Sequence, residues 1–256
     1  MIYTSDLDVG CKRSRHRLKL HDVGRKRGLL AAVRGLRLLA KYGTMTLGLI
    51  SPVQTLRAPM ALLKRDTHHY TYADYLKWSS SSGEELIDGA AYVREPPAPS
   101  PSHQEIVVGL CRQVDTALKG KPYRVYVAPF DVRLPKFAEQ DDQVDTVVQP
   151  DVLIVCDLEK IDARGMRGAP DWVAEVLSPY TASHDQVVKL PAYERAGVRE
   201  VWLVHPIDRT LAIYRLDAGR YGRPSIFGLK GKTQIAAVPG VTIDWDEMLV
   251  KMSPVL

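Results

Sequence analysis

The chain of 256 residues contains only three cysteines, Cys11, Cys111 and Cys156, and no Cys-x-x-Cys pair. An odd number of widely separated cysteines argues against a disulfide framework and against a cysteine-based zinc site. This usage fits the reducing cytoplasm. The motifs Gly-x-Ser-x-Gly, His-Glu-x-x-His and Gly-x-Gly-x-x-Gly are also absent, so the simplest signatures of serine hydrolases, zinc peptidases and dinucleotide-binding proteins are missing.

Two further functional classes lack the pattern that they need. Gly231-Lys232-Thr233 ends like a P-loop, but Ile226 stands where the first glycine belongs, so a nucleotide cradle is not expected. Arg34 and Arg37 interrupt the apolar run near the N-terminus, which argues against a transmembrane span. The long basic stretch before this run has no clear cleavage site and is unlike a signal peptide. We therefore expect no membrane partner.

The net charge of +5 is distributed unevenly along the chain. Residues 1–59 hold twelve lysines and arginines against three aspartates, whereas residues 60–256 hold 23 basic and 27 acidic residues. The basic, aperiodic run 11–27 predicts disorder, and the apolar spacing over 29–40 indicates a short basic amphipathic helix. We expect a basic extension over 1–59, either a genuine tail or an over-long gene model, followed by one folded domain over 60–256.

The segments after residue 70 predict an α/β fold with a mixed sheet. The first half contains a short helix after Thr71, a hairpin across Asp88-Gly89, a helix opened by a capping box of Ser102 and Glu105, and strands over 123–134 and 147–156. The second half contains a strand over 171–177, a helix with a capping box of Ser183 and Gln186 that ends at Gly197, and a strand over 200–205. Segments 211–215, 225–229 and 233–237 predict a C-terminal β-meander.

Two carboxylates stand beside or within these apolar strands. Asp151 opens the apolar run that ends at Cys156, and Glu175 lies in the middle of the next one. Isolated buried charge is expensive, so a shared cation is the simplest remedy, and Mg²⁺ prefers carboxylate oxygens. Lys189, on the following helix, completes a set suited to metal-assisted hydrolysis. Each residue also has a simpler interpretation, because Pro-Asp is mostly a turn and a lone helical lysine is mostly solvated.

Several short motifs, taken together and in order, resemble a known family. They are Glu85-Leu86-Ile87-Asp88-Gly89, a proline four residues before His103, Pro150-Asp151, Glu175-Val176-Leu177-Ser178-Pro179, Lys189, and Gly197-Val198-x-Glu200-x-Trp202-x-Val204. Over roughly residues 70 to 245 the chain resembles the Uma-two endonuclease family, a bacterial branch of the PD-(D/E)XK restriction-endonuclease-like superfamily. The resemblance implies a restriction-endonuclease-like αβββαβ core, a divalent metal and hydrolysis of DNA phosphodiesters.

The resemblance also implies roles for individual residues. Asp151 and Glu175 would bind Mg²⁺ or Mn²⁺, and Lys189 would position the attacking water or offset charge on the phosphate. Leu177 stands where the superfamily has its usual lysine, which in this branch has moved to the following helix and so points to Lys189. Glu85 is either an additional acidic ligand or a surface acid of the hairpin. His103 either lines the cleft or only caps a helix.

These inferences predict a cytoplasmic, metal-dependent DNA endonuclease that acts as a homodimer. Asp185 needs no role beyond favourable interaction with the dipole at the start of its helix. Two other functions remain open. The negative net charge of residues 60–256 favours a catalytically inactive relative that binds DNA or protein. The third function is a metal-dependent phosphoesterase that acts on small nucleotides.

Overall fold

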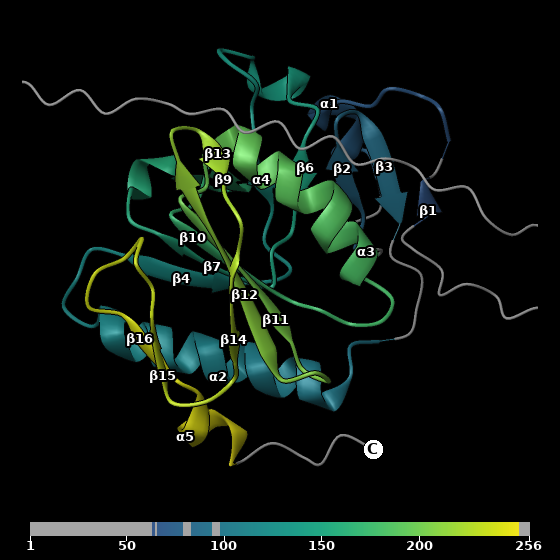
Figure 1. The fold of residues 1–256 in the computed structure, drawn as a ribbon. Helices are drawn as coiled ribbons and strands as arrows, with labels where there is room; N and C mark the ends of the chain where they lie inside the picture. Colours follow the sequence, from purple (N-terminus) through teal and green to yellow (C-terminus); the bar gives the residue numbers. More distant parts are fainter. Residues whose placement is uncertain (1–62, 65, 79–82, 94–97, 251–256) are drawn as a thin grey trace, which may run out of the picture. The chain divides into compact units, whose positions relative to one another are not determined.

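The computed structural model describes residues 63–64, 66–78, 83–93 and 98–250. The basic extension expected over 1–59 and the domain start at Met60 lie outside these residues. The central feature is a seven-stranded sheet in the order β13-β12-β11-β10-β7-β4, with β14 paired to β12 (Figure 1). Its strands are β4 (Arg124–Val127), β7 (Val152–Val155), β10 (Trp172–Val176), β11 (Glu200–His205), β12 (Thr210–Asp217), β13 (Arg220–Tyr221) and β14 (Ser225–Gly228).

The sheet is mixed, as the sequence predicts. β10 and β11 run parallel, and the other neighbouring strands pair antiparallel. The parallel pair is joined by a crossover that consists of α3 (Ala182–His184), the π-helical turn η3 (Asp185–Lys189) and α4 (Leu190–Ala196). The order α2, β4, β7, β10, α3–α4, β11 is the predicted αβββαβ core.

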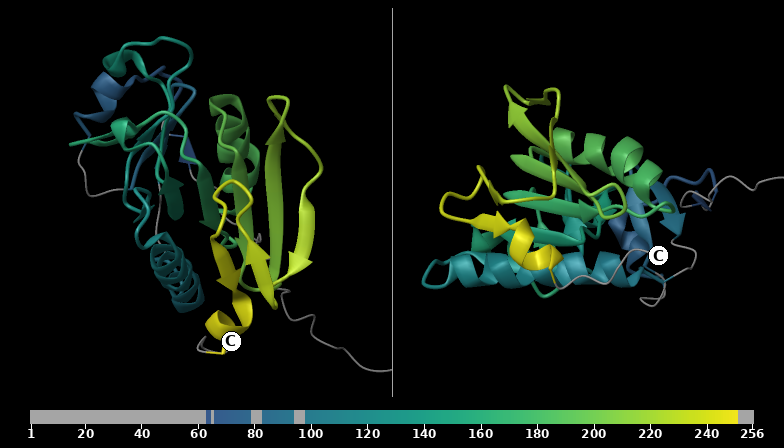
Figure 2. Two further views of the ribbon diagram at one scale, coloured as in Figure 1. Left: turned by 90° about the vertical axis from the view of Figure 1, so that its left-hand side faces the viewer. Right: turned by 60° about the horizontal axis from the view of Figure 1, so that its bottom comes forward.

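Helices cover both faces of this sheet, as Figure 2 shows. Alternate residues of β7 point to opposite faces because side chains alternate along a strand. Val152 and Ile154 join the apolar cluster that contains Ile106 and Leu110 of α2 (Pro101–Leu118). On the other face, Leu153 and Val155 join the cluster of α4, in which Tyr193 is fully buried. The two long apolar runs of the sequence are therefore strands buried on both faces.

A second sheet of short strands has the order β1-β3-β2-β6-β5-β9-β8. Its strands are β1 (Leu63–Lys64), β2 (Glu85–Ile87), β3 (Ala90–Val93), β5 (Val132–Arg133), β6 (Val147–Val148), β8 (Ile161–Asp162) and β9 (Gly165–Arg167). The short helix α1 (Tyr72–Tyr75) contacts the 3₁₀ turn η1 (Asp141–Gln143), and a second 3₁₀ turn, η2 (Leu158–Lys160), precedes β8.

Two predicted strands are wrong as continuous elements, because each divides between the two sheets. The segment 123–134 becomes β4 in the first sheet and β5 in the second, and 147–156 becomes β6 in the second and β7 in the first. Pro129 and Pro150 lie at these divisions. Proline has no backbone N–H to donate, so it ends a ladder of hydrogen bonds and lets the chain change sheets.

The predicted hairpin is confirmed as β2 and β3. Asp88 and Gly89 form its turn with φ angles of 51° and 74°, the positive values that a tight two-residue hairpin needs. A Cβ atom at position 89 would lie only 2.0 Å from Nδ1 of His69. The backbone angle therefore favours glycine at this position, and the absence of a Cβ atom also allows the close approach of the His69 ring.

The helix caps agree with prediction at α1 and at Gly197 but differ elsewhere. Thr71 caps α1, and Gly197 ends α4 in the left-handed conformation. The predicted box of Ser102 and Glu105 is wrong, because Ser100 caps α2 and accepts a 3.2 Å hydrogen bond from the His103 amide. Pro101 occupies the first helical position, which proline favours, so the cap moves one residue before it. The box of Ser183 and Gln186 is also wrong, since Ser183 lies inside α3 and Thr181 occupies the N-cap position, without a capping hydrogen bond from its side chain.

The C-terminal meander is only partly confirmed. β12 and β14 pair as predicted, but β15 (Lys232–Gln234) pairs with β16 (Thr242–Asp244) in a separate ribbon that leads into α5 (Trp245–Leu249). Ile235, Ile243 and Trp245 are fully buried in the α2 cluster, and this packing explains why the ribbon leaves β14. Within the described residues, no helix has the length and apolar character needed to cross a bilayer.

Candidate active site

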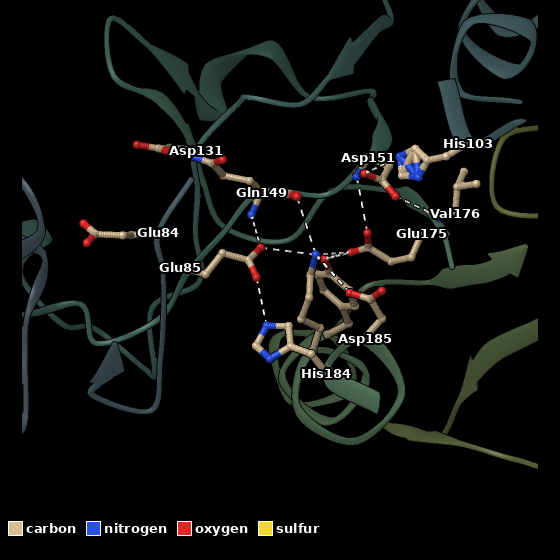
Figure 3. A network of polar contacts seen from close by, with 12 residues as sticks. Glu84, Glu85, His103, Asp131, Gln149, Asp151, Glu175, Val176, His184 and Asp185 are labelled. Carbon is tan, nitrogen blue, oxygen red and sulfur yellow. Dashed lines mark hydrogen bonds and ion pairs between the residues drawn. The ribbon is translucent and has the colours of Figure 1, made fainter. Parts of the chain in front are cut away.

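The predicted site residues meet where the chain passes from the second sheet into the first (Figure 3). β6 ends at Val148, and Asp151 comes directly before β7. β10 pairs antiparallel with β7, with Ala174 opposite Val152. This register brings Glu175, the next residue of β10, beside Asp151.

Asp151 and Glu175 form a buried pair of carboxylates, each of which accepts a hydrogen bond from a backbone amide of the neighbouring segment. The amide of Val176 donates a 2.8 Å hydrogen bond to Oδ2 of Asp151, and the amide of Asp151 donates a 3.3 Å bond to Oε2 of Glu175. Their exposed fractions are 6% and 1%. The hydrogen bonds fix both side chains in orientation, so the pair is preorganised.

Lys189 brings a single amine into this cluster of acids from η3. Its Nζ atom lies 2.7 Å from Oε1 of Glu175, 3.2 Å from Oε1 of Glu85 and 3.6 Å from Oδ1 of Asp185. Burial alone would lower the pKa of Lys189, but the neighbouring carboxylates, Glu175 first, outweigh it and raise the pKa above its ordinary value. Lys189 is 1% exposed, which excludes the interpretation as a solvated helix residue.

Glu85 reaches the same amine from β2 and is not a surface acid of the hairpin. One carboxylate oxygen accepts a 2.8 Å hydrogen bond from the Gln149 amide, and the other lies 2.9 Å from Nε2 of His184. Burial would raise the pKa of Glu85, but Lys189 and then His184 hold it at about 2. The carboxylate is therefore ionised, and it contacts groups from η3, from α3 and from the loop between β6 and β7.

His103 and Asp185 complete the surroundings of the pair. His103, in the first turn of α2, has its Nε2 atom 3.4 Å from Oδ1 of Asp151 and lines a groove together with Asp151 and Glu85. Asp185 was assigned only to the helix dipole, and this is wrong because it is 5% exposed beside Lys189. Burial, against the effect of Lys189 and together with the neighbouring carboxylates, raises the pKa of Asp185 well above its ordinary value.

Sequence reasoning missed three contributors to the cluster. The Tyr193 hydroxyl donates a hydrogen bond to Oε1 of Glu175, His184 contacts Glu85, and Gln149 contacts both Glu85 and Lys189 through its backbone. A signal existed for one of them, since positions 185, 189 and 193 recur every four residues on one helix face. Backbone contacts such as those of Gln149 leave no signal in the sequence.

The donor set fits a hard divalent cation that also keeps water ligands. Among the residues that the structure describes, no three His, Cys, Asp or Glu side chains form a complete metal-binding group. Mg²⁺, however, commonly takes only one or two protein carboxylates and completes its octahedron with water and phosphate oxygens. Four buried carboxylates surround one lysine in this cluster, so the local charge also favours an added cation.

Comparison with known proteins decides the family. The profile of the Uma2 family, described as "Putative restriction endonuclease", matches residues 72–246. The chain belongs to the Uma2 family. This membership supports a nuclease-type function for the protein.

The fold of this Uma2 protein also occurs in a solved structure. A crystal structure described as "a putative nuclease belonging to DUF820" from Anabaena variabilis ATCC 29413 is similar to it with a TM-score of 0.55 at 17% sequence identity. The match covers 70% of this chain and 97% of that chain, so the two share a fold. Among curated proteins, no significant match is found.

Proposed function

We propose that this Uma2 protein is a divalent-metal-dependent endonuclease that hydrolyses DNA phosphodiesters at Asp151, Glu175 and Lys189. The observation that carries the proposal is the contact of a buried amine with one member of a preorganised carboxylate pair, 2.7 Å from Glu175. Membership of a family described in terms of restriction endonucleases supports the same reaction class.

Asp151 and Glu175 are the proposed ligands of Mg²⁺ or Mn²⁺. Such an ion, when bound, supplies charge for phosphate oxygens and lowers the pKa of a coordinated water from about 15.7 toward 7. Lys189 stays cationic because its pKa is raised, so it is not a general base. Its proposed role is to orient the attacking water and to stabilise negative charge on the phosphate.

Two neighbouring residues take supporting roles in this proposal. Glu85 is held by Lys189, His184 and the Gln149 amide, so we assign it to positioning the lysine and not to the metal. His103 lies on the groove side of Asp151, where its imidazole can orient that carboxylate. The homodimer stays a prediction, which light scattering after size-exclusion chromatography would check.

A plasmid-cleavage assay tests the metal-dependent reaction. Wild-type protein should cut DNA in Mg²⁺ or Mn²⁺ and should not cut it in EDTA. Asp151→Asn should reduce the rate by at least about 100-fold, because it replaces a charged carboxylate ligand of the water-activating ion with a neutral amide. The control Asp208→Asn changes an exposed acid and should keep the wild-type rate. Cleavage by Asp151→Asn at the wild-type rate would contradict the assignment.

A second variant separates the lysine from the ligands. Lys189→Met should abolish turnover while Mn²⁺ binding, measured by calorimetry, persists. Loss of one partner of a buried ion pair costs roughly 3–5 kcal/mol, so circular dichroism must show that the variant is folded. Lys189→Arg, which keeps the charge, serves as a second variant if Lys189→Met does not fold. Undiminished turnover in folded Lys189→Met would exclude a catalytic role for Lys189.

One observation favours the alternative of a catalytically inactive binding module. Lys189 and Tyr193 both contact Oε1 of Glu175, which competes with metal ligation at that atom. Oligonucleotide binding with no Mn²⁺ binding and no cleavage would support this alternative. Hydrolysis confined to mononucleotide esters would instead support the small-nucleotide phosphoesterase.

A further inference from the structure

A groove of about 810 Å³ runs from the carboxylate cluster along α2 and β4. Asp151, Glu85 and His103 line one end of it. This volume lies within the range of about 300–1,000 Å³ that is typical of pockets for small ligands. The groove therefore has room for a flat organic group next to the proposed site of cleavage.

The walls of the groove away from the cluster are mainly apolar. Val107 and Val108 of α2 lie on one side, and Val125 and Val127 of β4 with Pro129 lie on the other. Val108 is 62% exposed and Val127 is 37% exposed, so both apolar side chains face solvent instead of the core. Exposed apolar side chains that line one groove are typical of a binding surface.

The charges along the groove do not suit a phosphate backbone. Arg112 is the one lysine or arginine among the described residues that line it, and its guanidinium is 2.8 Å from Glu247. Asp115 adds a negative charge to the same wall. A strand whose phosphates followed the groove would meet little positive charge, whereas an uncharged nucleobase with apolar faces fits these walls.

We propose that the groove receives an unpaired nucleobase next to the scissile phosphate, so the preferred substrate is single-stranded or locally unpaired nucleic acid. This inference rests on the proposed nuclease function, because it places the phosphate at the Asp151 end. A base in a duplex must first be unstacked and unpaired, at a cost of a few kcal/mol. Single-stranded substrate avoids most of that cost, and the groove then selects for it.

The test compares single-stranded, mismatched and fully paired oligonucleotides of one sequence. Rates of cleavage are measured in Mn²⁺, and binding of fluorescein-labelled strands is measured by polarisation in EDTA. Wild-type protein should bind and cleave single strands at least about tenfold better than the duplex, with the mismatch between them. Equal or better use of the duplex would overturn the inference.

Variants of opposite charge at one position identify which part of the strand occupies the groove. Val108→Lys and Val108→Glu should both weaken single-strand binding at least about fivefold, because a base that packs on this position would take either charge out of water. The matched substitutions Ile226→Lys and Ile226→Glu change an exposed residue on β14, at the β12 side of the sheet and away from β4, and should bind like wild type. Tighter binding by Val108→Lys with weaker binding by Val108→Glu would mean that phosphates occupy the groove. That result, or no effect, would overturn the inference.

The two readouts separate this inference from the proposed function. If the Val108 substitutions weaken single-strand binding but no cleavage occurs, the groove would be supported as a base-binding site and the proposed hydrolysis would be contradicted. If metal-dependent cleavage is the same in both Val108 variants as in the wild type, the proposed hydrolysis would be supported and base binding in the groove would be contradicted. Failure to bind single strands at all would also contradict the groove.

Discussion

Glu85, Asp151, Glu175 and Asp185 surround one amine, and this excess of buried acids dominates the site at the scale of residues. The pKa values of two of these acids shift in opposite directions. Glu85 stays ionised because Lys189 and His184 stabilise its charge, whereas the raised pKa of Asp185 favours its protonated form. At Glu85 the neighbouring cations outweigh the effect of burial on the pKa, whereas at Asp185 burial and the neighbouring carboxylates outweigh Lys189.

The pKa of Glu85 makes the stability of the fold depend on pH. Because this pKa falls from 4.5 to about 2, the ionised carboxylate stabilises the fold above pH 4.5, and the contribution disappears as pH falls toward 2. Glu85→Gln should lower the free energy of unfolding at pH 7 by about 3 kcal/mol and flatten its pH dependence in that window. Urea unfolding between pH 2 and 7 measures both effects.

An exposed acid gives the matched control for this experiment. Glu159→Gln changes a glutamate at the surface and should leave the curve of stability against pH close to that of the wild type. If the Glu85→Gln curve ran parallel to the wild-type curve below pH 4.5, the ionised state of Glu85 would not be a source of stability.

Sequence reasoning placed the candidate residues well but explained their surroundings poorly. Asp151, Glu175 and Lys189 do converge, because apolar strands with one acid each and a following helix limit the possible arrangements. The burial of Asp185 could not be predicted from its position near a helix start. It follows from the winding of η3, which depends on tertiary packing. The chemical roles of all these residues stay predictions.

At the scale of elements, the π-helical turn η3 sets the geometry of the site. It lies between α3 and α4 and contains both Asp185 and Lys189. A π-helical turn has more residues than an α-helical one and often occurs at functional sites. Val187, 68% exposed within the turn, can be removed without opening the core.

Deleting Val187 should convert η3 into regular α-helix. Asp185 and Lys189 would then be three residues apart in an α-helical turn instead of four in a π-helical one, which would shift Asp185 and His184 relative to the amine. Cleavage should fall by on the order of 100-fold, since small displacements of reacting groups have effects of this size. Circular dichroism should show unchanged helix content, and Val187→Ala should retain activity. Wild-type activity in the deletion variant would show that the turn is not needed.

The N-terminal cap of α2 can be tested by comparing two neighbouring serines. Ser100→Ala removes the hydroxyl that accepts from the His103 amide and should lower the free energy of unfolding by about 1 kcal/mol. Ser102→Ala should cost clearly less, because Ser102 is inside the helix. Denaturant unfolding of both variants measures the difference. If Ser102→Ala lowered the free energy of unfolding more than Ser100→Ala, Ser102 would be the N-cap, as the sequence predicts.

The elements differ in how far the sequence determines them. The hairpin at Asp88-Gly89, the strand around Glu175 and the helix end at Gly197 follow from local signals, so they were predicted correctly. The divisions at Pro129 and Pro150 were missed because apolar residues resume soon after each proline, at Phe130 and at Val152. Only the pairing of strands in two different sheets shows that such a run is two elements.

At the scale of the whole molecule, the charge of the chain separates into two regions. Residues 1–59 carry a net charge of +9 and residues 60–256 a net charge of −4. A polypeptide of residues 60–256 should unfold cooperatively with a Tm within about 4 °C of the full chain, equivalent to less than about 1 kcal/mol. Its binding to oligonucleotides should be weaker at low salt and less dependent on salt, because fewer basic residues replace counterions.

Calorimetry and salt titrations measure these two properties separately. Loss of cooperative unfolding in the shorter chain would contradict the domain boundary at residue 60. An unchanged salt dependence would instead show that the basic residues before it make no contact with the nucleic acid.

The deep burial of Lys189 has a consequence for chemical modification of the protein. Acylating reagents attack neutral amines that they can reach, and an amine that is 1% exposed and held as a cation meets neither condition. The lysines of the native protein should therefore divide by reactivity, with Lys189 modified last. Its modification would show that the contacts of its amine with Glu175 and Glu85 had opened to solvent.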